Sequence, residues 1–311
     1  MKKVYALILI AVLLAAGVQI LLEYSGYHKI PVEGGTLYGR PTGNDKELVV
    51  LLIAGSGPTD MDGNTVLIQG RNDSLRLLAQ DLAKAGVSTF RYDKRSAGKS
   101  VQTFDPSTEI DFDTFVRDCV KVIEYLKSQG YKNVVLAGHS KGSLVGMLAS
   151  QQTPVAGFIS LAGTGLPIDV TLEKQLLAQL PADSLEIRVI ESLREGVIDT
   201  SIPEDQMFSL AQQAFLLSWM PYEPGAIIAE MEMPVLVIQG DEDIQVDMDD
   251  FHPLQTHVNA ESSRIIEGMN HVLKDIRSTG DSNPLASYSD PSYPLHSDLV
   301  PAILEYLQNL S

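Results

Sequence analysis

The strongest constraint on the fold is a five-residue pattern, Gly-x-Ser-x-Gly, at residues 138–142. An apolar run of strand type leads into it and apolar residues at helical spacing follow it, so the local order is strand, sharp turn, helix. Gly138 and Gly142 lack the Cβ atoms that would block a close approach of strand and helix. Ser140 would then stand exposed at a helix N-terminus, where free N–H groups favour a developing negative charge. The pattern predicts a nucleophile at Ser140; the alternative is a serine that only caps the helix.

Composition narrows the classes of function. The chain has 311 residues, enough for one large α/β domain or two small ones. The net charge of −17 argues against nucleic acid as a partner, because phosphates require a basic surface. A single cysteine, Cys119, excludes an internal disulfide and a cysteine-based zinc site, and it lies on an apolar helical stripe that predicts burial. The six histidines show no ligand spacing. We therefore expect neither a metal nor another cofactor.

The first 23 residues form a segment of their own. Lysines precede an apolar stretch from Val4 to Leu22, which only Gly17 and Gln19 interrupt. Such a stretch indicates a signal peptide or a membrane anchor, with its basic end left in the cytoplasm. The apolar run continues beyond the small residues where cleavage would occur, which slightly favours the anchor. In either case the folded part is expected outside the cytoplasmic membrane, exported or tethered, with membrane contact only through this segment.

Strand and helix patterns alternate along the rest of the chain. Glycines in residues 24–46 predict a hairpin, and later apolar runs and helical stripes predict strands at 48–53, 87–92, 134–137, 155–161, 234–239 and 264–266, with helices between and after them. This alternation predicts an α/β fold, a mostly parallel twisted sheet with helices on both faces, formed by residues 24–167 and 231–311. Residues 168–230 show several amphipathic helical patterns and no convincing strand, and are interpreted as an inserted helical cap.

Candidate partners for Ser140 follow two late strands, because active groups in a parallel sheet collect at the carboxyl ends of its strands. One strand is followed by Asp241, Glu242 and Asp243, and the next by His271. An imidazole can take the proton of a serine hydroxyl and return it to the leaving group. A carboxylate on the other ring nitrogen holds the tautomer and stabilises the imidazolium. The residues predict a serine–histidine–carboxylate triad, with the three carboxylates as open alternatives for the acid.

A glycine-rich loop, AGSGPTDMDGN at residues 54–64, follows the first buried strand. Its glycines allow backbone N–H groups to approach a ligand. We expect the N–H groups of Ser56 and Lys141 to form an oxyanion hole. The alternative is an ordinary glycine turn.

The remaining polar residues near these motifs have structural interpretations. His139 is expected to pack in the core, and the other charged or imidazole side chains are expected at the surface: Lys94, Arg95 and Lys99 in a solvated loop, and His252 and His257 after the acidic turn.

These motifs resemble the α/β-hydrolase superfamily, over about residues 34–310. More narrowly, GSGPTDMDGN, RYDKRSAGKS, AGHSKGSL, GDEDIQV and NPLASYSDPSYPL are similar to exported bacterial esterases related to serine aminopeptidases and lysophospholipase-like hydrolases. The resemblance implies Ser140 as nucleophile, His271 as base and Asp243, third after the strand-ending glycine, as acid. Two positions depart from the family pattern. Ala54 stands where many hydrolases have histidine, and Lys141 follows the nucleophile where a neutral or acidic residue is usual.

The expected function is a serine hydrolase that cleaves carboxylic esters through an acyl-enzyme and needs no cofactor. An amide or peptide hydrolase or an acyltransferase would use the same triad, and a binding protein on a hydrolase scaffold is a third class, against which a complete triad argues. Residues 206–222 carry many apolar side chains, among them Phe215 and Trp219, which favours a small-molecule ester with a short to medium apolar acyl group. The sequence carries no signal of oligomeric state.

Overall fold

The computed structural model describes residues 26–95, 97–105, 107–277, 283 and 285–310. The segment 1–23, for which a signal peptide or anchor is predicted, lies outside these residues. Among the helices that the structure describes, none has the length and apolar character needed to cross a bilayer.

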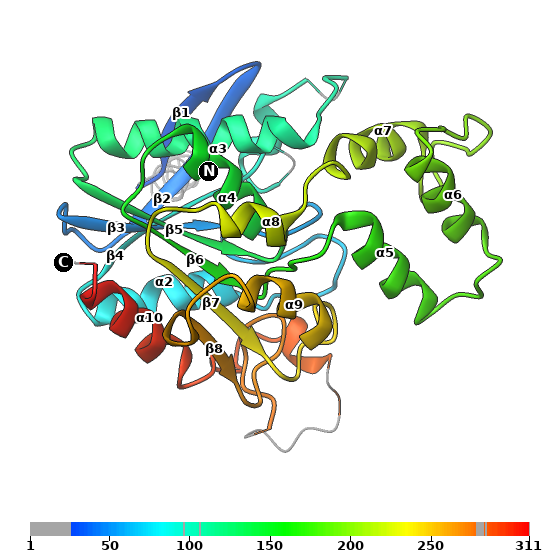
Figure 1. Cartoon of the computed structure of the whole chain (residues 1–311). Coiled ribbons are helices and arrows are strands. Elements are labelled where there is room, and N and C mark those ends of the chain that lie inside the picture. Colours follow the sequence, from blue (N-terminus) through cyan, green and yellow to red (C-terminus); the bar gives the residue numbers. More distant parts are fainter. Residues whose placement is uncertain (1–25, 96, 106, 278–282, 284, 311) are drawn as a thin grey trace, which may run out of the picture.

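One eight-stranded sheet organises the described residues (Figure 1). Its spatial order is β1-β2-β4-β3-β5-β6-β7-β8; β2 runs antiparallel to both of its neighbours, and every other neighbouring pair is parallel. The strands are β1 (His28–Val32), β2 (Gly35–Thr42), β3 (Leu48–Ile53), β4 (Ser88–Tyr92), β5 (Asn133–His139), β6 (Gly157–Leu161), β7 (Val235–Gly240) and β8 (Ser263–Ile266). The predicted hairpin is present as β1 and β2, and the prediction of a mostly parallel α/β sheet is confirmed.

Helices cover both faces of this sheet, as predicted, and this explains the continuous apolar runs of its central strands. In β3 every residue after Leu48 is buried. One face packs against α3 (Phe112–Ser128), α4 (Lys141–Gln152), α8 (Pro224–Ala229) and α9 (Met248–Gln255), and the other against α2 (Ser74–Lys84) and α10 (Leu299–Gln308) (Figure 1). The two apolar layers together fix the positions of the strand ends from which the functional loops start.

Helix α3 shows how the sequence encodes one of these layers. The Asp111 side chain accepts the backbone N–H of Thr114 and so caps the first turn. Apolar residues then recur at helical spacing and are buried, including Phe112 and Cys119. The predicted burial of Cys119 is thus confirmed, and the stripe brings α3 against both β5 and the helices that follow β6.

Four helices lie between β6 and β7, in the segment interpreted as a cap. They are α5 (Ile168–Leu177), α6 (Leu185–Arg194), α7 (Leu210–Trp219) and α8. Helices α5, α6 and α7 extend beyond the sheet on one side (Figure 1) and share a small apolar cluster of their own. Trp219 at the end of α7 stacks on Phe112 of α3, with ring centroids 5.0 Å apart, and Phe215 packs beside them. Aromatic contacts therefore join α7 to the core; the exact division into core and cap stays a prediction.

Candidate active site

Ser140 occupies the sharp turn between β5 and α4. Its backbone has φ 54° and ψ −126°, a strained conformation for a residue with a side chain. The turn is held in place because the N–H of Ser140 donates to the carbonyl of Leu161 (2.9 Å) and its carbonyl accepts the N–H of Ser143 (2.9 Å). A Cβ atom on Gly142 would lie 2.3 Å from the carbonyl oxygen of Ile53, so only glycine permits this contact with β3. The strain directs the half-buried Ser140 side chain to the carboxyl edge of the sheet.

His271 and Asp243 meet at the same edge. Nδ1 of His271 lies 2.7 Å from Oδ2 of Asp243, and both side chains are buried. The other carboxylate oxygen of Asp243 accepts the backbone N–H groups of Gln245 (2.8 Å) and Val246 (2.9 Å). Burial opposes the charge on Asp243, yet His271 and the backbone donors outweigh it and hold the pKa of Asp243 below its ordinary value. The carboxylate is therefore ionised at neutral pH and can orient the imidazole.

The two other carboxylates of the acidic turn have different partners. Asp241 accepts the N–H of Gly268 (2.6 Å) and pairs with Arg277 at 3.0 Å. Glu242 pairs with the same guanidinium at 2.8 Å. Both carboxylates therefore bind Arg277 at the surface, and Asp243 is the member of the turn that contacts His271.

His139, directly before Ser140, packs against His271. Its Nε2 donates to the carbonyl of His271 at 2.7 Å, and the ring centroids are 4.9 Å apart. Burial first, and then the neighbouring His271, lower the pKa of His139 to about 4. His139 is therefore neutral at physiological pH. Through this hydrogen bond His139 holds the loop of His271 against the end of β5, next to Ser140. The sequence predicted only that His139 would pack in the core.

The loop that is predicted to form an oxyanion hole contacts Ser140 directly. A Cβ atom on Gly55 would lie 3.0 Å from Cβ of Ser140, so the loop after β3 reaches the turn after β5. In the part of the chain that the structure describes, the backbone N–H groups of Ser56 and Lys141 have no hydrogen-bond acceptor. An oxyanion hole requires backbone N–H groups that are free to bind the oxyanion, and these two N–H groups meet that requirement.

The side chain of Lys141 is buried among aromatic rings. Its Nζ lies 4.1 Å from the ring centroid of Phe115, 5.5 Å from that of Phe215 and 5.8 Å from that of Trp219. Burial lowers its pKa to about 8, and the ring faces stabilise the remaining charge. The lysine at this position, where the family usually has a neutral or acidic residue, thus connects α4, which begins directly after Ser140, to α7.

The prediction that Lys94 and Arg95 lie in a solvated loop is wrong. Lys94 is 3% and Arg95 5% exposed. Arg95 forms a bidentate pair with Asp118 of α3, with distances of 2.7 and 2.5 Å, and Lys94 donates to backbone carbonyls. The polarity of each charged side chain alone predicts a position at the surface. The signal for burial is the place of Lys94 and Arg95 just after β4, which lies next to β3 in the sheet.

His252 and His257 are exposed, as predicted.

Comparison with known proteins agrees with this geometry. Residues 60–194 match the family model described as serine aminopeptidase, S33. Esterase EstD of Thermotoga maritima is 27% identical over 251 residues, which cover 79% of this chain and 58% of EstD. The structure of Est1E from Butyrivibrio proteoclasticus with bound ferulic acid has a TM-score of 0.61 at 17% identity, over 91% of this chain and 98% of that one. The Pyrococcus furiosus esterase Pf2001 has a TM-score of 0.56 at 13% identity, over 91% and 90% of the two chains. The described residues have the α/β-hydrolase fold.

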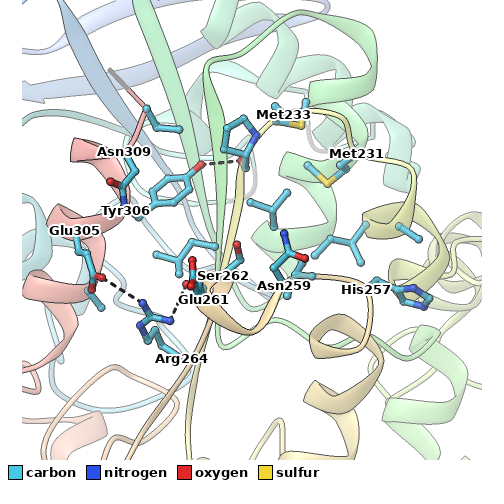
Figure 2. Close-up of a pocket in the computed structure, with 18 residues that line it drawn as sticks. Met231, Met233, His257, Asn259, Glu261, Ser262, Arg264, Glu305, Tyr306 and Asn309 are labelled. Carbon is cyan, nitrogen blue, oxygen red and sulfur yellow. Dashed lines mark hydrogen bonds and ion pairs between the residues drawn. The ribbon is translucent and has the colours of Figure 1, made fainter.

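A separate hollow of about 860 Å³ lies at the opposite edge of the sheet (Figure 2). It is lined by the amino ends of β7 and β8 and by α10, with Tyr306 bound to the carbonyl of Pro234 and Arg264 paired with Glu305. The candidate catalytic residues stand at the carboxyl ends of the strands, so this hollow is not the site of their chemistry.

The low pKa of His139 predicts that the fold is sensitive to acid. Between about pH 6.5 and about pH 4 the unfolded chain gains a proton at His139 that the folded chain does not, so stability falls as pH falls through this window. Substitution His139→Gln removes this titration. From pH 7.5 to pH 5.0 the wild type should lose about 2 kcal/mol more unfolding free energy than the variant, measured by urea denaturation. Equal losses in the two proteins would contradict the assignment of a neutral, buried His139.

Proposed function

We propose that this protein of α/β-hydrolase fold is a serine hydrolase that cleaves carboxylic esters through an acyl-enzyme. The observation that carries the proposal is the buried pair of His271 and Asp243, 2.7 Å apart, at the sheet edge where the strained turn presents Ser140. The strained backbone of Ser140 costs about 1–3 kcal/mol, and it persists because the surrounding structure stabilises it. Strain of this kind is typical of residues at active sites.

The proposed reaction begins with attack of Ser140 Oγ on the ester carbonyl carbon while Nε2 of His271 takes the hydroxyl proton. The carbonyl oxygen becomes an oxyanion held by the N–H groups of Ser56 and Lys141. Collapse of this intermediate breaks the bond to the alkoxide, which receives the proton from His271, and leaves an acyl-enzyme. Water then attacks the acyl carbon by the same steps and releases the acid. Asp243 keeps its charge throughout and holds the imidazole.

An amide or peptide hydrolase is the second candidate, because the matched family model describes a serine aminopeptidase. An aminopeptidase substrate carries an ammonium group close to the scissile bond. Here Lys141, the residue after Ser140, has a buried amine whose pKa of about 8 keeps it mostly cationic at neutral pH. Repulsion from this group disfavours a substrate ammonium and supports the ester, as do the names of the esterases that this chain resembles.

The aromatic residues around Lys141, the residue after Ser140, support a substrate with a short to medium apolar acyl group. Phe215 of α7 is only partly buried, whereas Trp219 is buried against the core. Phe215 is thus the better candidate for an acyl-pocket wall, and Trp219 has a packing role that its substitution would also disturb.

We also propose that residues 1–23 export the chain or anchor it in the cytoplasmic membrane. The proposal rests on the apolar stretch from Val4 to Leu22, which only Gly17 and Gln19 interrupt, and on the lysines that precede this stretch.

Substitutions in the triad should separate the three carboxylates of the acidic turn. Ser140→Ala and His271→Ala should each lower kcat/KM by about 10⁴-fold or more, and Asp243→Asn should be nearly as severe. Asp241→Asn is the matched control, because Asp241 pairs with Arg277 and should leave turnover nearly unchanged. Hydrolysis of p-nitrophenyl esters and of aminoacyl anilides measures these losses and separates esterase from amidase. A severe Asp241→Asn and a mild Asp243→Asn would refute the assignment of the acid.

Shortening the side chain of Phe215 should alter acyl-chain preference. Each methylene buried in a pocket contributes about 0.8 kcal/mol, so Phe215→Ala should change the ratio of kcat/KM between neighbouring chain lengths several-fold. The control is Leu210→Ala, on the same helix but with a side chain 45% exposed. Both variants should still react with a small fluorophosphonate. A Phe215→Ala variant with the chain-length profile of the wild type would place the acyl pocket elsewhere.

The proposed export is tested by cell fractionation. A chain starting at Tyr24 should be soluble, and the full chain should be found with membranes or in the exported fraction. Recovery of the intact full chain as a soluble cytoplasmic protein would contradict the proposal.

A further inference from the structure

Three successive carbonyl groups of the loop after β3, those of residues 55–57, accept hydrogen bonds from side chains. Nζ of Lys94 donates to the carbonyl of Gly55 and, at 2.8 Å, to that of Gly57. The hydroxyl of Thr59 donates to the intervening carbonyl of Ser56 at 2.7 Å. Three successive carbonyls therefore have donors, whereas the N–H of Ser56 has no acceptor among the described residues.

Because the peptide bond is planar, a hydrogen bond to the carbonyl of Gly55 also restricts the direction of the N–H of Ser56. The carbonyl of Gly55 and the N–H of Ser56 belong to one trans peptide unit, so they point in opposite directions. A donor that fixes the carbonyl on one side also fixes the N–H on the other side. Lys94 is the donor on that carbonyl, and Gly55 on the same loop is in contact with Ser140.

Lys94 is itself held rigidly. It is 3% exposed and follows β4, the strand paired with β3 from which the loop starts. Its neighbour Asp93 accepts the backbone N–H groups of Met61 and Lys99, both at 2.8 Å, and so ties the far end of the same loop to the segment of Lys94. Burial, and then the charge of Lys141, hold the pKa of Lys94 well below its ordinary value. A neutral amine still has two N–H bonds, so both carbonyls keep a donor in either protonation state.

We propose that Lys94 is a positioning residue that orients the Gly55–Ser56 peptide so that the N–H of Ser56 faces the oxyanion. The proposal rests on the serine hydrolase function proposed above. It assigns a role to a buried lysine that the triad chemistry does not use. Loss of Lys94 should weaken an interaction made in the transition state and leave ground-state binding of the ester nearly unchanged.

The test compares Lys94→Met, which keeps the length of the side chain and removes the donors, with Lys127→Met. Lys127 also donates to a backbone carbonyl, that of Pro154 at 2.6 Å, but lies at the far end of α3. Removal of one oxyanion donor costs about 10²–10³ in kcat, and a misdirected donor should cost about 10- to 100-fold. We expect kcat of Lys94→Met to fall by that factor with KM within about threefold, and Lys127→Met to resemble the wild type.

Two further measurements separate positioning from general damage to the fold. Across the wild type, Lys94→Met and Lys94→Ala, the affinity for a trifluoromethyl ketone, whose adduct carries the oxyanion, should fall in proportion to kcat/KM. Propylammonium, added to Lys94→Ala, should restore part of kcat, and Lys94→Met should show no such rescue. Urea denaturation of each variant establishes that it is folded at the assay temperature.

The outcomes distinguish this proposal from the function on which it rests. A wild type that labels at Ser140 and hydrolyses esters, with a folded Lys94→Met variant whose kcat is within threefold of it, would overturn the role of Lys94 alone. Loss of ketone affinity without a matching loss of kcat/KM would do the same. A wild type that neither labels nor hydrolyses esters would overturn both proposals.

Discussion

The arrangement at the carboxyl edge depends on the close approach of α4 to the end of β3. Gly142 permits it, since a Cβ atom there would lie 2.3 Å from the carbonyl of Ile53, and Gly138 permits the matching contact with the carbonyl of Gly142. The positive φ of Ser140 is the consequence, because the chain must reverse within one residue between strand and helix. Once this turn is fixed, the start of α4, the loop after β3 and the loop of His271 are brought against one another. The buried strands and their helices supply the stability that the strained residue requires.

Charges around this turn are buried with partners that suit each sign. On one side Asp243 accepts two backbone N–H groups and contacts His271, so its charge is stabilised where an imidazolium would form. On the other side Lys94 binds carbonyls and Lys141 faces aromatic rings. A buried charge without such partners would lower the stability of the fold by several kcal/mol, about the cost of desolvating it. The contacts of these side chains offset that cost.

Sequence patterns were sufficient to predict the strands, the helices and the meeting of histidine and acid, because these follow from local periodicity and from the rule that loops gather at strand ends. Ser140 and His271 come from motifs that need no long-range information. The choice of Asp243 came from family resemblance; in the structure it depends on the turn after β7, whose N–H groups bind its carboxylate. The burial of Lys94 was not predictable from its own stretch of sequence. It follows from the pairing of β4 with β3, which no local pattern encodes.

The central claim is that the turn at Ser140 and the loop after β3 together form an oxyanion hole around a reactive serine. A crystal structure of the protein after reaction with a small phosphonate tests it most directly. The account predicts a covalent bond to Oγ of Ser140, with a phosphonyl oxygen about 2.7–3.1 Å from the backbone nitrogens of Ser56 and Lys141. A phosphonate attached elsewhere, or one attached to Ser140 with its oxygen directed away from both nitrogens, would contradict the account.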